Sequence, residues 1–200
     1  MIFGFLLLTC VCLQDAPSFP QNDWISVQPK NAGAEVRMPV KPVHRERSFE
    51  AVRDQPVTVN MYSGTTPDKK KPFVFAYHDV FEKIRDKKHE KIILDGAVEG
   101  AKGPYIGDLI SDQEIMKDLN RGRDFTIIVN QNGNLVKIKQ RVLLVGQRLY
   151  QLNVVSAKED FDESEAKQFF DSLKLDKKPD KSKAKVKTSP PRKQDRDNGP

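Results

Sequence analysis

The sequence has few of the residues from which catalytic and metal sites are commonly built. Its 200 residues include two cysteines, Cys10 and Cys12, and three histidines, His44, His78 and His89. Both cysteines lie near the N-terminus, so a chain that loses this segment has no thiol for a disulfide, a zinc site or a nucleophile. The histidines are scattered and lack further ligands at matched spacing. We therefore predict no catalytic residue, no metal and no cofactor.

The sequence also lacks an apolar run long enough to span a bilayer, which needs roughly 20 residues. Residues 2–8 form a short apolar run, interrupted by Gly4, and small residues and a polar, proline-containing segment follow. This order resembles a secretory signal, and Cys10 and Cys12 have the spacing of a cleavage site before Leu13. No Lys or Arg precedes the run, and a buried N-terminal strand is the alternative. A lipid anchor at Cys10 is not favoured, because Thr9 stands where a smaller residue usually precedes the acylated cysteine.

The formal net charge of +6 is concentrated at the C-terminus. Residues 176–200 contain seven lysines and two arginines against four aspartates, a net charge of +5, and the rest of the chain carries only +1. Total charge therefore does not indicate a broad phosphate-binding face. We predict that residues 176–200 are a disordered basic tail, because they cannot bury enough apolar surface to fold. Adhesion to anionic surface polymers or lipid headgroups and nucleic-acid binding by counterion release are the second and third interpretations.

Short strands are predicted from Trp24 onward. Apolar and polar side chains alternate in residues 25–27, 34–38 and 57–62, and in residues 73–77 the aromatic Phe73, Phe75 and Tyr77 alternate with Val74 and Ala76. A second group of strands is predicted at residues 109–119, 125–130, 135–145 and 148–156, with turns at residues 120–122, 132–133 and 146–147. Period-two alternation is typical of half-buried antiparallel strands, and Asn132-Gly133 is a strong hairpin signal. On the last strand, Tyr150, Leu152 and Val154 share one face.

Two helices are predicted as well. Residues 79–102 place apolar side chains at helical spacing between charged ones, and Gly103-Pro104 ends the segment. Asp162 and Glu165 have the spacing of a capping box. The apolar stripe that follows requires a hydrophobic sheet to cover; it consists of Ala166, Phe169, Phe170 and Leu173.

The order of four short motifs resembles a family of uncharacterised exported bacterial proteins. The motifs are VRMPVKP (36–42), LNRGRDF (119–125), RVLLVGQRLYQLNVV (141–155) and EAKQFFDSLKL (165–175). The fold of that family is similar to that of PsbP, the extrinsic photosystem II protein. The resemblance implies an α+β fold for residues 24–175, an antiparallel sheet sandwiched by helices. Val40 stands where the family commonly has Gly, and Leu173 replaces its second Phe. The family has no established catalytic residues, so the resemblance implies none here.

Three basic residues, Lys137, Lys139 and Arg141, alternate along a predicted strand and therefore project from one face. One interpretation is an anion-binding stripe for polysaccharide, lipid headgroups or nucleic acid. The favoured interpretation is the solvated face of an antiparallel sheet. Aromatic residues are not interleaved with the three bases, which argues against stacking on single-stranded nucleic acid.

Two further patterns have the residue types of a site without its spacing. His78-Asp79 could pair a base with an orienting acid, but no nucleophile or further ligand accompanies it. We predict a strand-end histidine that faces solvent. Gly96, Gly100 and Gly103 fit neither a dinucleotide-binding motif nor a P-loop, and we interpret them as a weak helix and its terminator.

The sequence thus predicts a signal peptide at residues 1–12, a linker at 13–23, a PsbP-like domain at 24–175 and the basic tail at 176–200. The predicted function is that of a non-enzymatic, exported binding or accessory module of the periplasm or cell envelope. Its expected partner is an anionic envelope polymer or another envelope protein. The alternative is an intracellular protein that binds nucleic acid through its tail. A third hypothesis is an enzyme whose site forms only in three dimensions, around His78 or Asp95.

Overall fold

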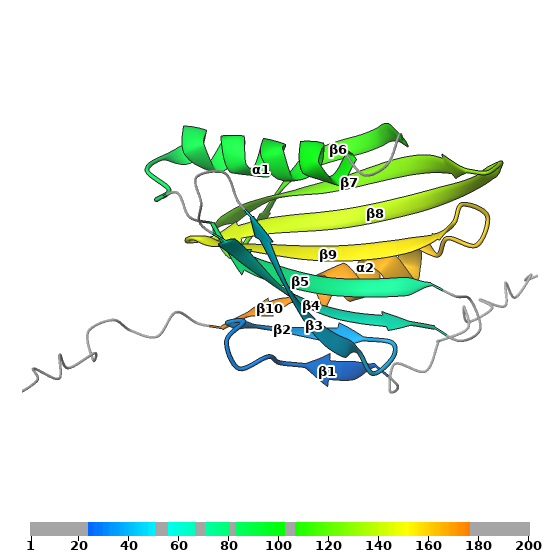
Figure 1. Ribbon diagram of the computed structural model, residues 1–200, viewed down its shortest axis with the longest axis horizontal. Coiled ribbons are helices and arrows are strands. Elements are labelled where there is room, and N and C mark those ends of the chain that lie inside the picture. Colours follow the sequence, from blue (N-terminus) through cyan, green and yellow to red (C-terminus); the bar gives the residue numbers. More distant parts are fainter. Residues whose placement is uncertain (1–23, 51–55, 67–70, 81–82, 103–106, 177–200) are drawn as a thin grey trace, which may run out of the picture.

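The computed structural model of the chain describes residues 24–50, 56–66, 71–80, 83–102 and 107–176. Within these residues the elements follow one another as shown in Figure 1: β1 (Ile25–Val27), β2 (Ala34–Met38), β3 (Val43–Glu50), β4 (Pro56–Thr65), β5 (Pro72–Asp79), α1 (Lys87–Lys102), β6 (Gly107–Lys117), β7 (Asn120–Gln131), β8 (Asn134–Val145), β9 (Arg148–Ala157), α2 (Glu163–Asp171) and β10 (Lys174–Leu175). The predicted signal peptide and linker, and the tail after Asp176, lie outside the described residues.

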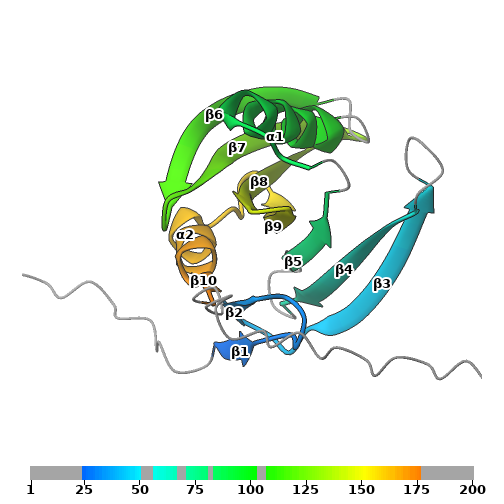
Figure 2. The ribbon, with the colours of Figure 1, turned by 90° about the vertical axis from the view of Figure 1, so that its left-hand side faces the viewer.

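Seven strands form one antiparallel sheet in the order β3-β4-β5-β9-β8-β7-β6. The first three strands are consecutive in the chain, and so are the last four. The two groups join where β5 pairs with β9, with Phe75 opposite Leu152 and Tyr77 opposite Tyr150. Figure 2 shows that the sheet curves strongly from β6 to β3. A smaller sheet, β1-β2-β10, is not joined to it by strand pairing.

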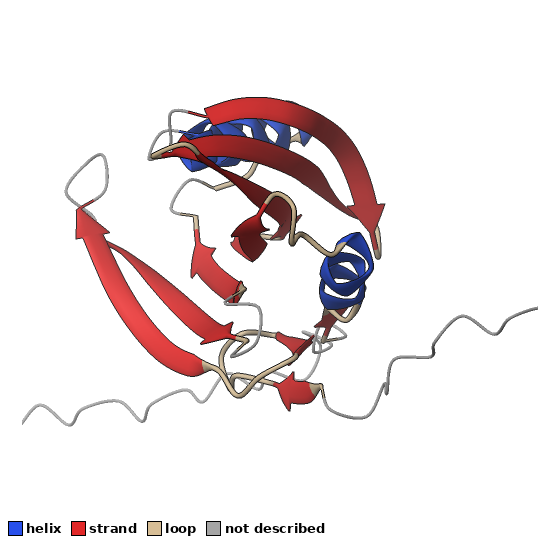
Figure 3. Cartoon of the chain, turned by 90° about the vertical axis from the view of Figure 1, so that its right-hand side faces the viewer, coloured by secondary structure: helices blue, strands red, loops and turns tan. Residues whose placement is uncertain are grey.

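Each face of the large sheet packs against a different helix, because side chains alternate along every strand. On the face that we call the α2 face, the core includes Phe73, Phe75, Leu143, Tyr150, Leu152, Phe169 and Phe170, together with apolar residues of β2. On the opposite face, the α1 face, the core includes Leu94, Val98, Phe125, Ile127, Ile138, Val142 and Leu149. Figure 3 shows the two helices well apart, with α2 beside the smaller sheet. The predicted sheet between helices is confirmed, but each helix covers only part of its face.

Local signals in the sequence fix the start of α2. The carboxylate of Asp162 accepts hydrogen bonds from the backbone N–H groups of Ser164 at 2.9 Å and Glu165 at 3.0 Å, which is the predicted cap. The predicted apolar stripe lies in the core, where Phe169 meets Phe73 edge to face with ring centroids 5.4 Å apart. Glu165 does not close a capping box; its carboxylate pairs with the buried ammonium of Lys71 at 2.9 Å.

Two predicted boundaries are wrong. Helix α1 begins at Lys87 and not at residue 79, because β5 continues through Asp79 and the carboxylate of Asp86 accepts from the N–H of His89 at 2.9 Å. The turn between β6 and β7 lies at Asp118 and Leu119, which have positive φ, and not at residues 120–122.

Gly122 belongs to the interior of β7. A Cβ there would lie 2.3 Å from the carbonyl oxygen of Val142, so the glycine serves close packing of the strand and not a turn. The predicted hairpin turns at Asn132-Gly133 and at Gly146 are confirmed by their positive φ angles.

Candidate functional site

Helix α1 leaves a groove along one side where it crosses the α1 face of the sheet. Leu94 and Val98 hold the helix against the sheet. The neighbouring helix face carries small side chains, Gly96, Ala97, Gly100 and Ala101, which form one wall of the groove. The cavity has a volume of about 580 Å³, which lies within the range of about 300–1,000 Å³ typical of small-molecule sites.

The floor of the groove is a patch of uncharged polar side chains within an aliphatic surface. The polar residues are His78 on β5, Gln140 on β8, and Gln151 and Asn153 on β9. Gln140 stands directly opposite Asn153 in the pairing of β8 with β9. The aliphatic residues of the lining are Met61, Val74, Val80, Ile93, Ile138, Leu149 and Val155.

Two of these polar side chains have a buried atom without a hydrogen-bond partner among the described residues. Nδ1 of His78 and Oδ1 of Asn153 are buried, and neither forms a hydrogen bond with any residue that the structure describes. Gln140, on the neighbouring strand β8, is only 6% exposed as a residue. An unsatisfied buried polar group costs about 1–3 kcal/mol, so such groups are rare and commonly mark a site of function.

His78 is uncharged in this setting. Burial lowers the pKa of its imidazole below the usual value, and the nearby carboxylate of Asp79 only partly opposes this effect. The prediction that His78 faces solvent is wrong, because β5 is an interior strand between β4 and β9 and His78 points to the groove side. Asp79 does not orient the imidazole through a hydrogen bond; its carboxylate accepts from Arg148 at 2.7 and 2.9 Å.

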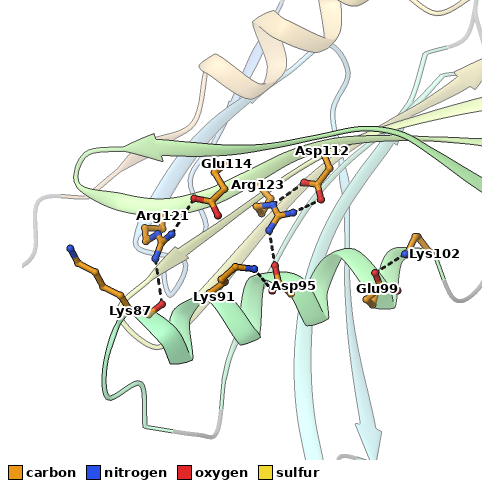
Figure 4. Close-up of polar contacts among 9 residues, drawn as sticks. All are labelled: Lys87, Lys91, Asp95, Glu99, Lys102, Asp112, Glu114, Arg121 and Arg123. Carbon is orange, nitrogen blue, oxygen red and sulfur yellow. Dashed lines mark hydrogen bonds and ion pairs between the residues drawn. The ribbon is translucent and has the colours of Figure 1, made fainter.

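The other side of α1 is held to the sheet by a cluster of ion pairs, shown in Figure 4. Arg123 on β7 donates to both carboxylate oxygens of Asp112 on β6 and to Asp95 on α1, the last at 2.6 Å. Lys91 reaches the second oxygen of Asp95 at 2.6 Å. The hydrogen bond from Lys91 and that from Arg123 lower the pKa of Asp95. Asp95, the second predicted centre of an enzyme pocket, therefore belongs to this cluster and not to the groove.

A second contact ties the start of the helix to the same strands. The guanidinium of Arg121 on β7 donates to the backbone carbonyl of Lys87 at 3.3 Å and to the carboxylate of Glu114 at 3.1 Å. The ion pairs fix the distance of α1 from β6 and β7, and thereby the position of the groove wall on its opposite side.

The basic stripe, for which a solvated sheet face was the favoured interpretation and an anion site the other, lies on the α2 face, on the far side of the sheet from the groove. Lys137 and Lys139 both pair with the carboxylate of Glu163, and the distance from the Lys139 ammonium is 2.6 Å. Arg141 makes a two-point contact with Asp124 at 2.8 and 2.7 Å and reaches Asp171 at 3.2 Å.

The stripe is consequently not a solvated sheet face, because α2 lies over it. The Lys137 ammonium lies 4.6 Å from the ring centroid of Phe161, and the Arg141 guanidinium lies 5.2 Å from that of Phe170. Partial burial acts to raise the pKa of Glu163, but the two lysines together lower it. Binding of an external anion here stays a prediction, and it would compete with carboxylates that are already in place.

Sequence reasoning missed Gln140, Gln151 and Asn153. A signal for them was present, since Gln151 and Asn153 occupy the face of β9 opposite Tyr150 and Leu152. An amphipathic helix covers part of that face, where aliphatic residues are expected. The interpretation of Gly96 and Gly100 as helical residues is confirmed, and Gly103 lies outside the described residues.

The described residues contain no group of three or more His, Cys, Asp or Glu side chains placed to hold a metal ion. Neither of the two described helices has the length and apolar character needed to cross a lipid bilayer.

Sheet order and helix placement together define an α+β fold of the PsbP-like type. Its fold is similar to the solution structure of the cyanobacterial PsbP protein CyanoP from Synechocystis sp. PCC 6803, with a TM-score of 0.55, 10% identity, and coverage of 82% of this chain and 98% of that one. A protein of unknown function from Pseudomonas aeruginosa, PA94, titled a putative regulator, is matched at a TM-score of 0.40 and 10% identity over 68% of this chain and 85% of that one. No protein-family model and no curated protein matches the chain. At such low identity the likeness shows the fold alone, and it confirms the PsbP-like fold predicted from the sequence.

Proposed function

We propose that this protein is a non-enzymatic, exported binding or accessory module of the cell envelope that binds its ligand in the groove beside helix α1. The observation that carries the proposal is the pair of unpartnered buried polar atoms in the groove, Nδ1 of His78 and Oδ1 of Asn153. A ligand that forms hydrogen bonds with these atoms would offset the free-energy cost of burying them without partners.

The composition of the lining supports binding over catalysis. Among the described lining residues the titratable side chain is His78, so acid–base chemistry would lack a second group to complement it. The walls also support a preformed site, since the ion pairs of Arg123 hold α1 from the far side. A preformed site reduces the entropy lost on binding.

Two helical glycines lend further support. A Cβ at Gly96 or at Gly100 would meet no atom within 4 Å. Glycine in a helix interior costs about 1 kcal/mol relative to alanine. The chain therefore carries two unfavourable residues at positions where nothing in the described structure requires their small size except the open groove.

Binding can be tested with N-phenyl-1-naphthylamine, an uncharged fluorescent probe that brightens in apolar sites. We expect saturable binding to the wild type and at least a tenfold loss of affinity in Gly100→Leu, which places a large side chain at the groove wall. Glu99→Leu is the matched control, because Glu99 is exposed on the same helix and outside the lining. Equal probe affinity in the two variants would refute the groove as the binding site.

Export is the second part of the proposal, and it rests on the signal-like N-terminal segment and on the resemblance to exported proteins. Mass spectrometry of the native protein should find a mature N-terminus near Leu13 in the envelope or extracellular fraction. An intact Met1 in the cytoplasmic fraction would rule export out.

A further inference from the structure

The lining of the groove excludes a charged ligand on physical grounds. No Lys, Arg, Asp or Glu stands among the described lining residues. A charged group that enters such a groove gives up hydration and finds no opposite charge, which is very costly. His78 offers no countercharge near neutral pH, because its burial disfavours the imidazolium form.

The apolar part of the lining is aliphatic. Met61, Val74, Ile138 and the other apolar residues carry branched or linear chains, and no Phe, Tyr or Trp stands among the described lining residues. A flat aromatic ligand would bind here through its apolar surface alone, without the added stacking on Phe, Tyr or Trp rings that favours aromatic over aliphatic ligands. The chemistry that fits is a flexible aliphatic chain.

The polar part of the floor is a set of carboxamides. Gln140 and Asn153 face each other across β8 and β9, and Gln151 lies two residues from Asn153 on the same face. A carboxamide offers an acceptor and two donors, and a second amide can satisfy both kinds of group at once. The buried Oδ1 of Asn153 needs a donor, which the N–H of an amide supplies.

We infer that the groove binds an uncharged aliphatic amide, with its amide paired to Gln140 and Asn153 and its chain against Met61, Val74 and Ile138. The inference rests on the proposed function and specifies its ligand class. A terminal carboxamide and an amide within an acyl chain share this chemistry.

The test is displacement of N-phenyl-1-naphthylamine at pH 7.5 by four ten-carbon ligands of matched size. Decanamide carries the amide at the chain end and N-butylhexanamide carries it within the chain, so the two separate the possible sources. Decanoate and decylammonium supply the charged comparisons. We expect at least one amide to displace the probe at a concentration at least tenfold lower than either ion.

Two variants connect this preference to the floor. Gln140→Met and Asn153→Leu keep side-chain volume and remove the amides, and each should weaken displacement by the amide about tenfold. Gln113→Met is the matched control, because Gln113 is exposed on β6 and outside the lining. Thermal unfolding of each variant shows whether it is folded.

The outcomes separate the two proposals. If the probe binds and Gly100→Leu blocks it, but the amides compete no better than decanoate, the proposed function stands and the amide inference is overturned. The inference is also overturned if Gln140→Met and Asn153→Leu both retain the amide preference. If the probe binds equally to Gly100→Leu and Glu99→Leu, the groove itself is rejected.

Discussion

Replacing the two groove-wall glycines with alanine should stabilise the protein. Gly96 and Gly100 lie one helical turn apart within α1, and a Cβ at either position would meet no heavy atom within 4 Å. The substitution therefore adds no clash, while it reduces the backbone entropy lost on folding and improves helix propensity. Each change should raise the free energy of unfolding by about 1 kcal/mol, and the double variant by about 2 kcal/mol.

The gain can be measured by urea unfolding followed by circular dichroism. For a domain of this size about 1 kcal/mol corresponds to about 3 °C in Tm, so the double variant should melt about 6 °C higher. The same variant narrows the groove, so its affinity for N-phenyl-1-naphthylamine should fall while its stability rises. Opposite changes in stability and affinity are expected where a site is kept open at a cost in stability.

Gly122→Ala provides the contrast. Its Cβ would lie 2.3 Å from the carbonyl oxygen of Val142 in the neighbouring strand, so backbone would have to move and the variant should lose stability. Reduced or unchanged stability in both Gly96→Ala and Gly100→Ala would refute the reasoning, because it would show that the wall of the groove is not open at these positions.

Two further predictions concern the charges around the groove. Arg123→Met removes the partner of Asp112, whose side chain is 20% exposed, and frees α1 at Asp95; it should lower the free energy of unfolding by about 1–3 kcal/mol. Arg121→Met, whose partner Glu114 is 56% exposed, should cost less than about 1 kcal/mol, and equal losses in urea unfolding would contradict the role of Arg123. His78 has a lowered pKa in the folded protein, so the unfolded chain binds more protons below about pH 6.5, the usual pKa of histidine, and stability should fall as pH falls through this range. His78→Gln should remove this part of the pH dependence between pH 7.5 and 5.5, and identical slopes in the two proteins would show that His78 is not the group responsible.

Local patterns were sufficient for much of the fold. The alternation of Tyr150, Leu152 and Val154, the Asn132-Gly133 turn and the cap at Asp162 each depend on a few adjacent residues and were predicted correctly. Strand β3 was not predicted, because most of its residues are polar. The regular alternation of apolar and polar side chains that marks a half-buried strand is therefore missing. The Asn-Arg-Gly segment was mistaken for a turn because Gly122 is required by the neighbouring strand, which a local pattern does not contain.

Most of the candidate site was missed by sequence reasoning. Three of its polar residues were passed over, and His78 was assigned to solvent. Whether these residues come together in one groove depends on the pairing of β5 with β9, which are far apart along the chain, and on where α1 crosses the sheet. Such contacts are chosen by long-range burial of apolar surface and not by local backbone preference.

The sequence by itself therefore determined the α+β class, the positions of most strands, the cap of α2 and the concentration of the net charge in residues 176–200. Those features follow from side-chain periodicity, turn chemistry and charge, which act over short distances. The tertiary structure decided which helix covers each face, which basic residues are paired, and that an amide-lined groove lies beside α1. Each of these depends on groups brought together from distant segments, and that proximity exists only when the sheet has formed.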